Sequence, residues 1–105
     1  MNLNKEEIIL FLNEKLPRQY IISSFLFGSI TTEKVNPSDC DLFLVTKLTP
    51  DDSNWREFLK EVSYLKKDFF NCFQLPLNTT INTEVEFKEP TGFKERVLNG
   101  NIVPV

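Results

Sequence analysis

The chain has 105 residues, a length that fits one domain, residues 1–105, built around one hydrophobic core. Its formal net charge is −3, from 12 basic and 15 acidic residues, which argues against generic electrostatic binding to nucleic acid. No apolar run approaches the ~18 residues of a membrane span, and no signal peptide is visible. The two cysteines have no metal-finger spacing, so we expect a reduced, cytoplasmic protein without a membrane partner.

The sequence contains no histidine. This excludes Ser-His and Cys-His nucleophile pairs and imidazole metal sites. Acid–base chemistry must therefore come from carboxylates, Lys, Tyr, Cys or a metal-bound water.

The N-terminal region predicts a helix followed by a buried strand. Asn4 is a candidate helix N-cap with Glu7 as its capping-box partner, and the helix should run to about residue 16, where Pro17 stops it. The nearly continuous apolar run over residues 20–27 indicates a strand that is buried on both faces.

A polar turn separates this strand from a second one. The first strand ends in Gly28-Ser29, and residues 29–38 should form a loop that opens with a short helical turn. The second strand covers about residues 40–47. The sequence therefore predicts a strand, a polar loop and a second strand in this region.

Asp39 and Asp41 open the second strand and share a face, because side chains alternate along a strand. Two like charges beside a buried run are costly unless a cation lies between them. No basic residue is close in sequence, so a divalent metal is the simplest candidate, and carboxylate oxygens suit Mg²⁺. Gly28 lets the backbone approach a ligand, while Ser29 offers a hydroxyl and the start of an anion-binding turn. Phosphate on one side and metal-binding carboxylates on the other is the arrangement that a nucleoside triphosphate needs.

The second half predicts a long helix, a strand, a short helix and a terminal strand. The long helix should cover residues 51–70, with its aromatic stripe forming core. After a loop over residues 71–78, alternating polar and apolar side chains predict a strand over residues 80–88. A short helix over residues 91–99 and an edge strand over residues 102–105 follow. The strand–helix–strand unit implies a parallel crossover, so we expect an α/β (α+β) fold with a small mixed sheet of three to four strands and helices packed against it.

The Gly28-Ser29 pair, nine intervening residues and Asp39-Cys40-Asp41 resemble the signature of the DNA polymerase beta-like nucleotidyltransferase superfamily. The small size resembles its minimal nucleotidyltransferase branch, which is antitoxin-like. The resemblance implies the nucleotidyltransferase fold and metal-dependent transfer of a nucleoside monophosphate from a nucleoside triphosphate, such as ATP, to a hydroxyl on protein, RNA or a small molecule. It also implies that the two aspartates are catalytic and hold two Mg²⁺ ions, with Mn²⁺ as a substitute, and that Gly28 and Ser29 bind phosphate.

Catalytic members of this superfamily usually carry a third acid on the neighbouring strand, where it binds metal and assists the acceptor hydroxyl. Glu84 and Glu86 are the candidates, since both lie on one face of the predicted strand over residues 80–88. A parallel pairing favours Glu84 as a metal ligand, while Glu86 has the more apolar neighbours. A solvated strand face is the alternative interpretation of both.

The sequence departs from the family pattern in its cations. Many members have Arg soon after Gly-Ser, whereas Ile30 follows here and Lys34 is the nearest cation for phosphate binding. Lys88, Lys94 and Arg96 are further candidates from the C-terminal segment, although solvated surface charges are the commoner interpretation.

Two functions remain open from the sequence. The first is the metal-dependent nucleotidyltransferase. The alternative is a non-catalytic or weakly catalytic antitoxin-like module that binds a helical HEPN-type toxin. In either case, crowding of the acids should raise at least one carboxylate pKa in the absence of metal.

Overall fold

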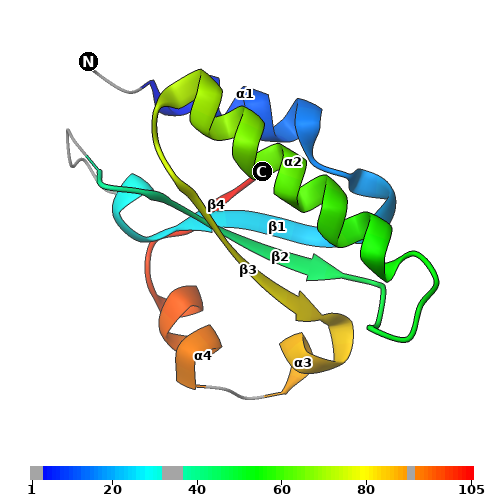
Figure 1. Cartoon of the computed structure of the whole chain (residues 1–105). Helices are drawn as coiled ribbons and strands as arrows, with labels where there is room; N and C mark the ends of the chain where they lie inside the picture. Colours follow the sequence, from blue (N-terminus) through cyan, green and yellow to red (C-terminus); the bar gives the residue numbers. More distant parts are fainter. Residues whose placement is uncertain (1–3, 32–36, 90–91) are drawn as a thin grey trace.

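The structure is a computed structural model that describes residues 4–31, 37–89 and 92–105. Its strands form one mixed sheet in the order β3-β2-β1-β4 (Figure 1). β1 (Ile21–Phe27) runs antiparallel to β2 (Cys40–Thr46) and to β4 (Val103–Pro104), whereas β2 and β3 (Leu77–Thr83) are parallel. The sequence-based expectation of an α/β fold with a small mixed sheet is confirmed, including the parallel crossover between β2 and β3.

The helices are α1 (Lys5–Lys15), α2 (Trp55–Phe73), α3 (Glu84–Lys88) and α4 (Gly92–Asn99), with two short 3₁₀ helices, η1 (Arg18–Tyr20) and η2 (Gly28–Thr31). α1 and α2 cover one face of the sheet, and α3 and α4 lie against the other (Figure 1). None of the helices within the described ranges has the length and apolar character needed to cross a membrane.

The main core lies between the sheet and the layer of α1 and α2. The predicted apolar stripe of α2 supplies four fully or nearly fully buried side chains, Phe58, Val62, Leu65 and Phe69. They pack against the strand residues that point to this face, such as Leu42. Burying such side chains stabilises the fold by about 1.5–3 kcal/mol each before entropy costs.

A smaller aromatic core holds α3 and α4 on the opposite face. Phe25 and Phe43 stack with ring centroids 4.9 Å apart, and Phe87 of α3 contacts Phe43 edge to face at 5.8 Å. Val97 of α4 is buried in the same cluster. This face of the sheet also carries the two aspartates.

The predicted ends of α1 are correct, whereas α2, predicted over residues 51–70, begins and ends later in the chain. Asn4 caps α1 by accepting a hydrogen bond from the Glu6 N–H at 2.9 Å, and α1 ends just before Pro17. α2 begins at Trp55 rather than at residue 51, because Asp52 closes a separate turn with its side chain, which accepts from the Thr49 N–H at 2.8 Å.

The predicted strand over residues 80–88 is wrong at both ends. β3 begins at Leu77, inside the segment interpreted as a loop, and ends at Thr83. The chain then turns into α3 because Thr83 and Glu86 form a capping box: the Thr83 side chain accepts from the Glu86 N–H at 3.2 Å, and the Glu86 side chain accepts from the Thr83 N–H at 2.9 Å. Glu84 and Glu86 therefore lie on a helix beyond the sheet.

The C-terminal elements agree with the prediction. α4 covers Gly92–Asn99, and β4 pairs with β1 at the edge of the sheet, where Pro104 needs no ladder donor.

Candidate functional site

The two aspartates lie where three strands begin or end next to one another. In the sheet register, Asp41 stands opposite Phe27 on β1 and opposite Asn78 on β3. Because side chains alternate, Asp39 and Asp41 share the face that carries Phe43, as expected from the sequence. The aspartates therefore point to the side of the sheet on which α4 lies.

Asn78 bridges the two carboxylates. Its side-chain Nδ2 donates to Asp39 Oδ2 at 2.8 Å and to Asp41 Oδ1 at 3.4 Å. A donor between two like charges partly offsets their repulsion. From the sequence, a metal ion was expected to do this. Sequence reasoning missed Asn78 because it placed residues 71–78 in a loop. The missed signal is the alternation of Leu77, Thr79 and Ile81, which extends the strand pattern back past Asn78.

Gly28 packs directly against Asp41. Its φ is +77°, a conformation that side-chain-bearing residues rarely adopt, and a Cβ added there would lie 2.5 Å from Asp41 Oδ2. Ser29 follows within η2, and the Thr31 hydroxyl closes this turn by donating to the Gly28 carbonyl at 2.7 Å. The structure thus brings the candidate phosphate-binding turn and the candidate metal-binding carboxylates into contact.

The structure does not bring Glu84 or Glu86 to this site, so the expectation that one of them completes it is wrong. Glu84 follows Asn78 by six residues of a strand that rises ~3.3 Å per residue, which puts it about 20 Å away. Glu84 pairs with Lys88 at 3.4 Å, and Glu86 is used in the capping box. Within the described ranges, no third Asp, Glu, Cys or His forms a metal-binding group with the two aspartates.

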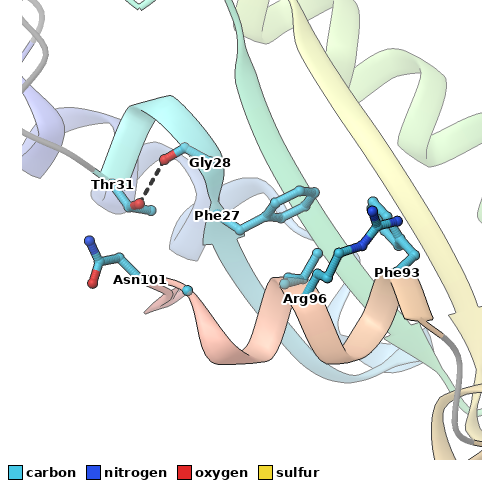
Figure 2. Close-up of a pocket in the computed structure, with 8 residues that line it drawn as sticks. Phe27, Gly28, Thr31, Phe93, Arg96 and Asn101 are labelled. Atoms are coloured by element: carbon cyan, nitrogen blue, oxygen red, sulfur yellow. Dashed lines mark hydrogen bonds between the residues drawn. The ribbon is translucent and has the colours of Figure 1, made fainter.

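A pocket of about 510 Å³ opens beside Gly28 (Figure 2). The residues that line it come from the end of β1, from η2, from α4 and from the segment after α4: Phe27, Gly28, Thr31, Phe93, Arg96, Val97, Gly100 and Asn101. Phe27, which stands opposite Asp41 in the sheet, forms part of this wall. Neither aspartate lines the pocket, and its link to them is Gly28, which lines the pocket and contacts Asp41. The remaining phosphate-binding candidate, Lys34, lies outside the described residues.

Residues 6–103 match the family described as "Polymerase beta, Nucleotidyltransferase". The chain belongs to this family. No curated protein matches it significantly.

Two solved structures share the fold of this nucleotidyltransferase domain. One is the double mutant D39ED41E of the toxin–antitoxin MntA-HpeT, at 15% identity and a TM-score of 0.54 over 95% of this chain and 71% of that one. The other is a toxin–antitoxin with AMP-PNP, at 16% identity and a TM-score of 0.57 over 97% of this chain and 72% of that one. At these identities the likeness establishes the fold.

Burial is the main cause that raises the pKa of Asp41 in this member of the family, followed by the charge of Asp39, while the hydrogen bond from Asn78 acts in the opposite direction. The expectation of a raised carboxylate pKa is confirmed, but the crowding that was expected to cause it contributes less than burial does. Cys40, between the aspartates, points into the main core, where burial and then the charges of Asp41 and Asp39 raise its pKa to about 12. Its thiol therefore stays protonated and is no nucleophile.

The donor set fits a hard divalent cation. Asp39 and Asp41 offer carboxylate oxygens from one face, and the amide oxygen of Asn78 becomes a ligand if the side chain turns over. Mg²⁺ is commonly held by one or two carboxylates together with substrate phosphates. When bound, such an ion would supply the positive charge that lets two carboxylates and a phosphate approach one another.

Removing the Asp41 charge tests whether this carboxylate is built for a ligand rather than for stability. A raised pKa in the folded state means that its contribution to stability is fully present below the unfolded pKa of about 3.9 and is lost as the pH rises through the folded pKa. Asp41→Asn should therefore be as stable as the wild type at pH 7, or more stable, without metal. Urea unfolding between pH 3.5 and 8 measures this.

The matched control is Asp68→Asn, which removes an exposed carboxylate from α2. If Asp41→Asn is clearly less stable than this control at pH 7, Asp41 is a structural residue and the prediction fails.

Proposed function

We propose that this protein binds a nucleoside triphosphate together with one divalent ion, Mg²⁺ or Mn²⁺, between the Gly28-Ser29 turn and the two aspartates. The observation that carries the proposal is the contact between Gly28 and the Asp41 carboxylate. Phosphate oxygens bound by the turn would lie next to the acids that hold the ion. Membership of the nucleotidyltransferase family over residues 6–103 supports the same ligand.

Transfer of the nucleoside monophosphate to a hydroxyl is slow or absent in this proposal, because the residue beside the two aspartates on the neighbouring strand, where the family resemblance implies a third acid, is the amide Asn78. An amide neither neutralises a second ion nor takes a proton from the acceptor hydroxyl. The two-ion arrangement implied by the family resemblance needs that third charge. We therefore favour one ion shared with the triphosphate, and weak catalysis at most.

The corresponding biological role is an antitoxin-like module that binds a helical HEPN-type toxin. Support comes from the two solved structures above, both of which are toxin–antitoxin assemblies. We further propose that residues 1–105 form one domain that works in the cytoplasm, a setting that suits the free thiols of Cys40 and Cys72.

Nucleotide binding is tested by thermal unfolding with ATP, CTP, GTP or UTP, each with and without Mg²⁺. Ligand at one hundred times its Kd should stabilise the wild type by about 2.7 kcal/mol, and only when Mg²⁺ is present. Asp41→Asn should lose this shift because it loses a charge that the ion needs, whereas Asp68→Asn should keep it. A wild type that no nucleotide stabilises would overturn the proposal.

Restoring the third acid tests the role of Asn78. Asn78→Asp should raise the transfer of labelled nucleotide from ATP to protein or RNA in a bacterial lysate about tenfold or more, since a carboxylate can bind metal and accept a proton. Asn82→Asp is the control: it adds the same charge to the same face of β3, four residues further along the strand. Equal transfer by wild type and Asn78→Asp would show that Asn78 does not limit catalysis.

A further inference from the structure

One charged side chain lines the described part of the pocket beside Gly28. Of the described residues that line the pocket, Arg96 alone carries a charge. Arg96 and Phe93 project from α4 on one side, and Phe27 points toward them from the end of β1 (Figure 2). The Phe27 and Phe93 rings meet edge to face at 6.1 Å, so the pocket has an apolar floor with a guanidinium beside it.

The other two cations of the C-terminal segment, Lys88 and Lys94, are bound to groups of α3 and of the residue that follows it. Lys88 pairs with Glu84 at 3.4 Å. Lys94 donates to the carbonyl oxygens of Phe87 and Glu89 and lies over the Phe87 ring, so it fastens α4 to the end of α3. These contacts leave Arg96 as the cation of the C-terminal segment that faces the pocket.

Arg96 is oriented by its own helix. Its Nε donates to the Gly92 carbonyl at 3.2 Å, one turn earlier in α4, and within the described ranges no carboxylate forms an ion pair with it. The two terminal nitrogens of the fork are the groups that bind phosphate oxygens in pairs. The Arg96 side chain is exposed, so a ligand can reach these nitrogens.

Gly28 links the aspartates to the pocket, because it contacts Asp41 and lines the pocket that Arg96 also lines. Phe27 stands opposite Asp41 in the sheet, and its ring contacts Phe93 of α4. A triphosphate that extends from Gly28 into the pocket would therefore meet the Asp41 carboxylate next to Gly28 and the residues of α4 along the pocket wall. A nucleoside triphosphate carries more negative charge than one divalent ion neutralises, so it gains from a second cation.

We infer that Arg96 binds the phosphates of the nucleotide and supplies from α4 the cation that the segment after Gly28-Ser29 lacks at Ile30. The inference rests on the proposed function and adds a phosphate ligand to that site. Arg96 acts as a binding residue, so its loss should weaken affinity for any chain of phosphates, whichever base is attached.

The test is isothermal titration calorimetry of the full chain with Mg²⁺-ATP and, separately, with Mg²⁺-tripolyphosphate, which has no base. Arg96→Gln should weaken the affinity for both ligands about tenfold or more. Arg96→Lys should lose less affinity, because lysine keeps the positive charge but lacks the two terminal nitrogens of the guanidinium. Arg56→Gln, which removes an exposed guanidinium from α2 on the other side of the sheet, should bind both ligands like the wild type.

The outcomes separate this inference from the proposed function. If the wild type binds neither ligand, the proposed function fails and the inference fails with it. If the wild type binds, Asp41→Asn does not, and Arg96→Gln binds like Arg56→Gln, the inference is overturned while the proposed function stands. Weaker ATP binding with unchanged tripolyphosphate binding would place Arg96 on the base and would also overturn it. Melting temperatures verify that each variant is folded. If Arg96→Gln does not fold, the affinities of Arg96→Lys and the wild type are compared instead, and equal affinities would overturn the inference.

Discussion

The site depends on two carboxylates that must be held side by side at the edge of a buried strand. Asp39 and Asp41 share a face by strand geometry, and burial together with mutual repulsion makes the charged state of Asp41 costly. Two neighbours accommodate this cost. Gly28 leaves room for the Asp41 carboxylate that any side chain would fill, and Asn78 donates to both acids.

The fold explains why these particular neighbours meet. The β1–β2 pairing sets the end of β1 beside Asp41, so the chain can turn at Gly28 directly against the acid. The long crossover helix α2 returns the chain to pair β3 in parallel with β2, and this register delivers Asn78 to the same place. In the proposed function the same register also limits catalysis, because the residue delivered is an amide rather than an acid.

Much of this arrangement could be predicted from the sequence, because its signals are local. The Gly28-Ser29 turn, the Asp39–Asp41 pair and the apolar stripe of α2 are each defined by spacing over a few residues. The end of β3 was predicted wrongly, since the alternation of Val85 and Phe87 suggested a strand that continues past Thr83. The capping box of Thr83 and Glu86 overrides that alternation and turns the chain into α3.

The position of Arg96 beside the pocket could not be predicted from local sequence signals. Its i,i−4 bond to Gly92 is local, but its place beside Gly28 follows from the packing of α4 on the aromatic cluster of Phe25 and Phe43. No short-range pattern encodes such a contact, because it joins segments almost seventy residues apart. Sequence reasoning could therefore name Arg96 as one of several cations but could not choose among them.

The most direct measurement is the place where a paramagnetic ion binds. In the ¹⁵N-labelled protein with ATP, Mn²⁺ should broaden the backbone amide signals of Gly28, Asp41 and Asn78 most strongly. The signals of Glu84 and Glu86 in α3 should be affected least, since that helix lies about 20 Å from Asn78 along β3. Broadening centred on α3, or none that depends on ATP, would contradict a metal–nucleotide site built from the two aspartates and Gly28.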